Sequence, residues 1–293
     1  MSATPNRIAG RAKAACLAGW LVLAPLFAHA QGFAACLAGW LVLAPLFAHA
    51  QGFAVFLSPS RFDLPVKAGE SRREVLEFHH VGRENGRYRI YTNDWEFRPD
   101  YAVQFNDALA PDSCRPWVAL ERREISLTPN QRYRFRFEVT VPPGTPAREC
   151  RFALMVEGAD PAQAAGQSLN MPVAGRIGVI VYLRVGDVEA DLAVRSAGVQ
   201  VAEGQSLPTL EVTNRGNGHG RLEGFLTAKD AGGKSVELAP DNVPILPGMT
   251  RRIPLRPVGE EGKAPPALQY PLTVKGTLEW GKRREPLELR FER

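Results

Sequence analysis

Short segments of alternating apolar and polar residues restrict the possible fold of this chain more than any other feature. The clearest example runs from Tyr133 to Val141, where apolar side chains alternate with Arg, Glu and Thr. This period of two is typical of a β-strand with one buried and one solvated face, whereas an amphipathic helix repeats every 3.6 residues. Similar segments recur along the chain between turns rich in Pro, Gly, Asn and Asp, with no convincing helical stretch. The pattern predicts an all-β protein.

The spacing of these segments indicates two immunoglobulin-like β-sandwich domains. We place the first domain at 51–186 and the second at 187–293, with the boundary near Gly186 and Asp187. Further strands of the first domain are expected around 58–64, 74–80, 87–95, 125–127 and 150–156. In the second domain the long one-sided segment from Tyr270 to Trp280 is the clearest strand.

The segment from Gly175 to Val185 differs from the others because it is almost continuously apolar. Such a run fits a strand covered on both faces, or one whose outer face contacts a partner. Ile177, Val179, Val181 and Leu183 share one face, and one of the two faces must belong to the core. We weigh a partner-binding surface and cover by the neighbouring domain about equally for the other face.

Residues 1–50 are typical of a secretory signal peptide, with a basic start, an apolar stretch and a small-x-small cleavage motif. The segment 14–33 recurs unchanged as 34–53, and such identity indicates a recent duplication or a sequence error rather than a structural repeat. Cleavage is possible after Ala30 or after Ala50, and we favour Ala50 because it leaves no second apolar segment. An uncleaved membrane anchor is the alternative. The leader predicts export to the periplasm.

The mature chain has little net charge. Of 36 basic and 31 acidic residues, three basic residues and no acidic ones lie in 1–50, which leaves 33 against 31, or +2. A nucleic-acid partner would need a concentrated basic face, so the near-neutral mature chain leads us to expect no nucleic-acid partner. Arg132, Arg134 and Arg136 follow one side of a strand, but glutamates are mixed among them, so we interpret them as a solvated strand face.

Only Cys114 and Cys150 remain in the mature chain, and an even pair in an oxidising compartment is expected to form a disulfide. We expect no metal site, because His79 and His80 point to opposite faces of a strand. The sequence contains no nucleophile elbow, metalloprotease helix or phosphate-binding loop. We therefore expect neither a catalytic site nor a cofactor, and a binding function rather than an enzyme.

Several motifs of the first domain resemble one known family. They are Ser58-Pro59-Ser60-Arg61, Asn93-Asp94-Trp95, Leu127-Thr128-Pro129-Asn130, Pro142-Pro143-Gly144 and the apolar strand from Arg176 to Val185. Together they make the region from Ala54 to Asp187 similar to the N-terminal domain of the periplasmic pilus-assembly chaperones of the chaperone-usher type.

The resemblance implies a binding mechanism. In that family an arginine of the first strand and a lysine of the last strand hold the C-terminal carboxylate of a pilin subunit, and the last strand completes the subunit's sheet. Arg61 matches the arginine, and Arg176 stands nearest to the lysine. The implied partner is an exported pilin-like or surface protein, bound through Arg61, Arg176, Ile177, Val179, Val181 and Leu183. The alternative is a structural or adhesive cell-envelope protein without chaperone activity.

Overall fold

The computed structural model describes residues 53–159, 162–163, 172–173, 175–202, 204–259 and 266–292. In these ranges the regular structure consists of β-strands and one 3₁₀ turn, η1 (Arg115–Trp117), so the all-β prediction is confirmed. The described residues all belong to one unit of the chain. The predicted signal peptide and its two cleavage sites lie outside the described residues. No helix in the described ranges is long and apolar enough to cross a membrane.

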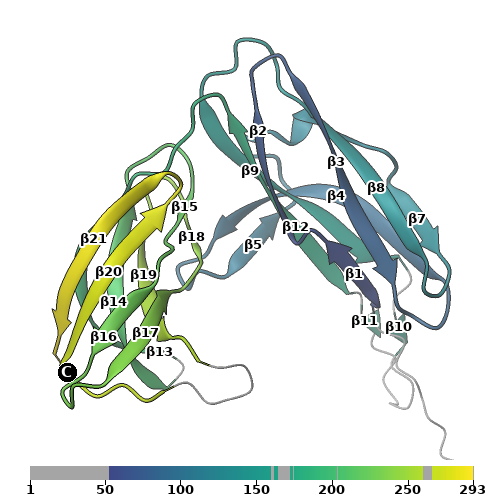
Figure 1. The fold of residues 1–293 in the computed structure, drawn as a ribbon. Helices are drawn as coiled ribbons and strands as arrows, with labels where there is room; N and C mark the ends of the chain where they lie inside the picture. The colour runs from purple at the N-terminus through teal and green to yellow at the C-terminus, as the bar shows by residue number, and fades with distance from the viewer. Residues whose placement is uncertain are drawn as a thin grey trace, which may run out of the picture. The chain divides into compact units, whose positions relative to one another are not determined.

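The first sandwich consists of two main sheets (Figure 1). One sheet has the order β1 (Val55–Ser58), β3 (Ser71–His80), β8 (Arg132–Thr140) and β6 (Val118–Leu120). The other has the order β2 (Arg61–Val66), β12 (Arg176–Val185), β9 (Arg148–Gly158), β4 (Gly86–Phe97) and β5 (Val103–Asn106), with β7 (Glu124–Leu127) also paired to β4. The short strands β10 (Ala162–Gln163) and β11 (Pro172–Val173) pair with each other.

Alternation along the strands builds the core of this sandwich. Phe135 and Phe137 of β8 are at most 2% exposed and face the same core as Phe152 and Leu154 of β9, which are fully buried. Burial of each such side chain contributes about 1.5–3 kcal/mol. Cys114 and Cys150 form the predicted disulfide beside this core, with their Cα atoms 6.1 Å apart.

The structure divides the predicted opening strand 58–64 into two strands. β1 pairs with β3 in one sheet, and after Pro59 the chain crosses to the other sheet as β2. Proline has no N–H to donate to a sheet ladder, so the pairing is interrupted there. This crossing determines where β2 first reaches β12.

The strands of the second sandwich form one seven-stranded sheet that folds over its own core (Figure 1). Its order is β13 (Leu192–Ala202), β14 (Gln205–Asn214), β19 (Thr250–Pro257), β17 (Ser235–Pro240), β16 (Leu226–Lys229), β20 (Leu272–Trp280) and β21 (Arg283–Phe291). β15 (Gly220–Arg221) and β18 (Pro244–Ile245) form a separate pair. Leu210 of β14 and Val274 of β20 are fully buried in the same cluster, so strands from different parts of the sheet enclose one core.

Candidate partner-binding edge

β12 has two halves with different neighbours. From Ile180 to Val185 it pairs with β9 on one side and in parallel with β2 on the other. From Arg176 to Val179 it pairs with β9, and no other strand among the described residues pairs with the other side of its backbone there. We call Arg176–Val179 the open edge. An unpaired row of N–H and C=O groups is the template on which an added strand can pair.

The side chains of β12 point to two covered faces. Val179, Val181 and Leu183 are at most 1% exposed and belong to the core of the first sandwich, while Ile177 is partly buried against that core. On the opposite face Tyr182 is 2% exposed, in a cluster with Trp95 and Met155 of the first sandwich and Leu246 of the second. Of the two alternatives for the outer face, the structure shows cover rather than a free surface at Tyr182. Ile177 and Gly178 are partly exposed, whereas Val179, at the end of the open edge next to Ile180, is 1% exposed.

Arg61 stands where the open edge ends. It begins β2, lies opposite Ile180, and its side chain is 48% exposed. Its Nε lies 3.6 Å from Oδ2 of Asp63, an exposed pair that leaves other donors of the guanidinium available. A guanidinium in this position can form a bidentate contact with a carboxylate at the end of an added strand.

The structure does not bring Arg176 to Arg61. Arg176 lies at the other end of the open edge, four residues or about 13 Å along the strand, opposite Glu157. Glu157 also accepts hydrogen bonds from Arg89 Nη2 (2.8 Å) and Tyr91 Oη (2.9 Å). The hydrogen bond from Arg89 is the main reason why the pKa of Glu157 is lowered. The two arginines therefore do not form a single anion site.

Several neighbours of Arg61 were not predicted from the sequence. His219, from the turn before β15, lies 3.3 Å from Asp63 and 2.7 Å from the buried carboxylate of Glu149. Arg221 follows two residues later. Burial is the first cause of its lowered pKa, and the positive charge of Arg61 contributes, which places the two guanidinium groups within electrostatic reach. The glycine-rich sequence 214–220 marked a turn but carried no signal that His219 would reach β2.

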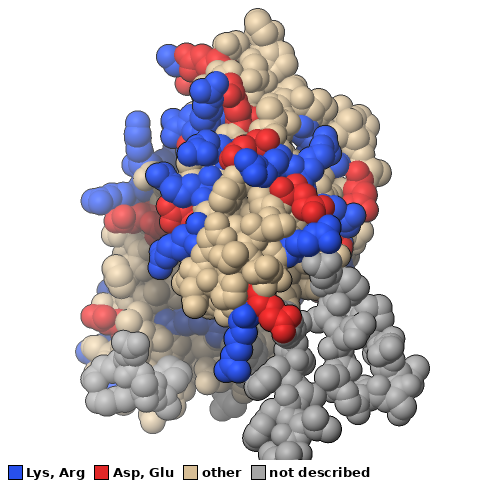
Figure 2. Space-filling view, turned by 90° about the vertical axis from the view of Figure 1, so that its right-hand side faces the viewer, with Lys and Arg blue, Asp and Glu red and all other residues tan. Residues whose placement is uncertain are grey.

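The arginines on the outer face of β8 have nearby acids. Arg134 lies 3.7 Å from Glu77, and Arg136 lies 3.8 Å from Glu121. Figure 2 shows blue and red side chains interspersed on the face turned toward the viewer rather than a continuous basic surface. Such exposed pairs contribute about 0–1 kcal/mol each, and their arrangement is that of a solvated strand face.

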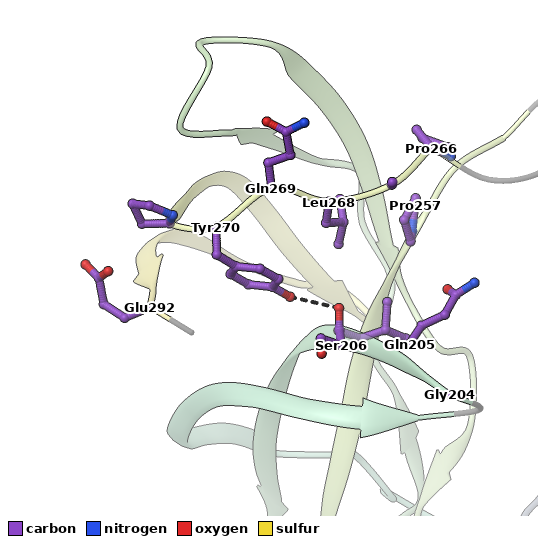
Figure 3. A pocket seen from close by; sticks show the side chains of 12 residues that line it. Gly204, Gln205, Ser206, Pro257, Pro266, Leu268, Gln269, Tyr270 and Glu292 are labelled. Atoms are coloured by element: carbon purple, nitrogen blue, oxygen red, sulfur yellow. Dashed lines mark hydrogen bonds between the residues drawn. The ribbon is translucent and has the colours of Figure 1, made fainter.

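A separate hollow of about 770 Å³ lies at one end of the second sandwich (Figure 3). Leu207, Pro257 and Leu268 contribute to its lining, together with polar groups such as Gln205 and Gln269. The hydroxyl of Tyr270 donates a hydrogen bond to the carbonyl of Ser206 (3.0 Å) across it. None of the predicted binding residues lines this hollow.

No protein-family model matches the sequence. No curated protein matches it either. Among solved structures the chain is similar to fimbrial chaperones. A chaperone–tip adhesin complex of CFA/I fimbriae is 13% identical, with 82% of this chain and 99% of that chain covered and a TM-score of 0.45. The E. coli chaperone DraB is 17% identical (81% and 98% covered, TM-score 0.41). The Salmonella enterica complex of SafA pilin with the SafB chaperone is 14% identical (81% and 96% covered, TM-score 0.39).

The resemblance predicted from the sequence is thus also found among solved structures. At these TM-scores, all below 0.5, the likeness assigns neither a site nor a role to this chain.

Proposed function

We propose that this protein is a periplasmic, chaperone-like or assembly-accessory protein that binds extended segments of exported polypeptides by strand addition. The observation that carries the proposal is the open edge, which ends beside the half-exposed guanidinium of Arg61. An added strand pairs with the backbone of Arg176–Val179, and its C-terminal carboxylate meets Arg61. Backbone pairing supplies affinity for any extended chain, and the charge selects a chain end.

The partner we propose is an exported subunit, pilin-like or destined for the surface. The similar structures include one chaperone in complex with a tip adhesin and another in complex with a pilin. This function requires no catalytic group or cofactor, since strand addition makes and breaks hydrogen bonds only. Val179, Val181 and Leu183, which we predicted to contact the partner, have their side chains in the core of the first sandwich. Val181 and Leu183 also have both backbone sides paired, so in this proposal they support the strand, and Val179 offers the partner only its backbone.

Capture of a partner from periplasmic extracts tests the proposal. We expect Arg61→Ala to weaken capture at least about tenfold, because a hydrogen bond to a charged group contributes about 1.5–3 kcal/mol. Ile177→Glu should also weaken it by placing a charge beside the added strand. Arg195→Ala, an exposed arginine on β13 of the second sandwich, is the matched control and should leave capture unchanged. Equal capture by all four proteins would refute strand addition at this edge.

A structural role in the envelope is the second candidate. The observation that favours it is the complete burial of Val181 and Leu183 and the near-complete burial of Tyr182, so that most of the apolar strand is core. Hydrogen exchange separates the two candidates. Strand addition predicts rapid exchange at those amides of Arg176–Val179 that point away from β9, and slower exchange of the same amides when a partner is added. A purely structural strand exchanges at the same rate with and without the partner.

A further inference from the structure

His219 occupies an unusual environment where the two sandwiches meet. Its side chain is only 8% exposed, and its ring stacks on that of Tyr182 with centroids 3.7 Å apart. Nδ1 lies 2.7 Å from Oε2 of Glu149, and Nε2 lies 3.3 Å from Oδ1 of Asp63. A neutral imidazole has a single N–H, so only the protonated ring can donate to both carboxylates at once. The geometry is that of an imidazolium held between two acids.

Asp63 connects this histidine to the proposed anchor. One carboxylate oxygen of Asp63 faces His219, and the other faces Nε of Arg61 at 3.6 Å. Any carboxylate brought by a partner must therefore compete with Asp63 for the guanidinium of Arg61. How strongly Asp63 competes depends on how much of the negative charge of its carboxylate is offset by a positive charge on His219.

We propose, on the basis of the function proposed above, that His219 is a positioning residue: in its protonated form it holds Asp63 and leaves Arg61 free for the partner's carboxylate. Because His219 belongs to the second sandwich, that sandwich contributes to the binding of the partner's carboxylate at Arg61. When His219 loses its proton, the carboxylate of Asp63 interacts more strongly with Arg61 and competes with the partner's carboxylate for the guanidinium. Capture of chain ends is strongest while the imidazole is charged.

The charges around His219 agree with this role. Glu149, whose side chain is fully buried, accepts both Nδ1–H and the backbone N–H of His219 (2.9 Å). Burial lowers the pKa of His219, but the hydrogen bonds and charges of Asp63 and Glu149 outweigh it and leave the pKa raised. The hydrogen bond from His219 is the main cause of the lowered pKa of Asp63. The titratable and charged groups that face this cluster are Arg61 and Asp63 on β2, Glu149 and Arg151 on β9, Tyr182 and Arg184 on β12, and Arg221 on β15.

Two peptides test the proposal on the mature chain. Both are extended Val/Thr sequences, identical except that one ends in a free carboxylate and the other in an amide. We expect binding of the carboxylate peptide to weaken several-fold as the pH rises through the pKa of His219, measured by NMR of the same protein. The amide peptide should bind weakly at every pH, because it brings no charge to Arg61.

Two variants make the test specific. Asp63→Asn removes the competitor and should bind the carboxylate peptide equally well across the pH range. His219→Gln cannot titrate and should lose the pH dependence, with binding at the weak, high-pH level. Two results overturn the positioning role alone. One is that binding of the carboxylate peptide to Asp63→Asn depends on pH as it does for the wild-type protein. The other is that binding to the wild-type protein shows no change at the pKa of His219. No binding of either peptide at any pH overturns the proposed function, and the positioning role with it.

Discussion

The two halves of β12 show how similar sequences acquire different roles. Both halves are apolar, and both pair with β9. The second half is also paired with β2, and its Val181 and Leu183 are fully buried, whereas the first half has an open backbone side and a partly buried Ile177. The difference arises at Pro59, after which the chain crosses between the sheets and meets β12 only from Ile180 onward. Pairing, more than side-chain character, separates the two halves. We call Ile180–Val185 the core half, although Val179 of the open edge is also buried.

Truncation of the core half should produce the largest effect. We expect Leu183→Ala to lower the free energy of unfolding by about 2–5 kcal/mol, because it removes a fully buried side chain and leaves a cavity. Ile177→Ala should cost clearly less, since Ile177 is only partly buried. Urea denaturation of both variants measures the difference. Equal losses at the two positions would contradict the division of β12.

The disulfide should support the same core half, because Cys150 lies opposite Leu183 in the pairing of β9 with β12. Replacement of Cys114 and Cys150 by Ala is expected to cost about 2–5 kcal/mol, since the cross-link restricts the unfolded chain. Thermal unfolding of the oxidised protein, the reduced protein and the double variant gives the value. Loss of the disulfide should change the amide exchange rates of Arg176–Val179 less than those of Ile180–Val185. An equal change of exchange rates along the whole of β12 would argue against two separable halves.

Stability should also depend on pH through His219, beside the core half. Its pKa is raised above the unfolded value of 6.5, so the stabilisation is complete below that value and is lost as the pH rises through the folded-state pKa. Denaturation of the mature protein and of His219→Gln across this range checks the sign. The variant should show a flatter profile, and a wild-type profile that rises with pH in this window would exclude a charged His219 in the folded state.

The smallest effect is expected at the far end of the open edge. Arg176 lies opposite Glu157, whose carboxylate accepts hydrogen bonds from Arg89 and Tyr91, so Arg176→Ala leaves this carboxylate with both donors. We expect the free energy of unfolding to fall by less than about 1 kcal/mol, the range typical of exposed charged groups. Chemical denaturation beside Arg195→Ala as a surface control measures it. A loss comparable to that of Leu183→Ala would mean that the open edge is as tightly integrated as the core half.

Local sequence information predicted the elements better than the site. Alternation from Tyr133 to Val141 located β8, and the two cysteines of the mature chain indicated their disulfide. The family resemblance grouped Arg61 with Arg176, which lie at opposite ends of the open edge. It also included Val179, Val181 and Leu183 among the partner contacts, although their side chains are core. Periodicity indicates that a strand has two faces, but it does not show which element covers each face.

The sequence by itself determined the all-β class, because strand alternation is a local property that survives in any arrangement of the strands. It also indicated the disulfide, because only two of its four cysteines, Cys114 and Cys150, lie outside the predicted signal peptide. Only the tertiary structure decided that the backbone of Arg176–Val179 has one open side and that His219 reaches Asp63 and Glu149. These features join residues that are 70 or more positions apart in the sequence. They depend on where the chain crosses between sheets and which loop meets which strand, and no short stretch of sequence carries that information.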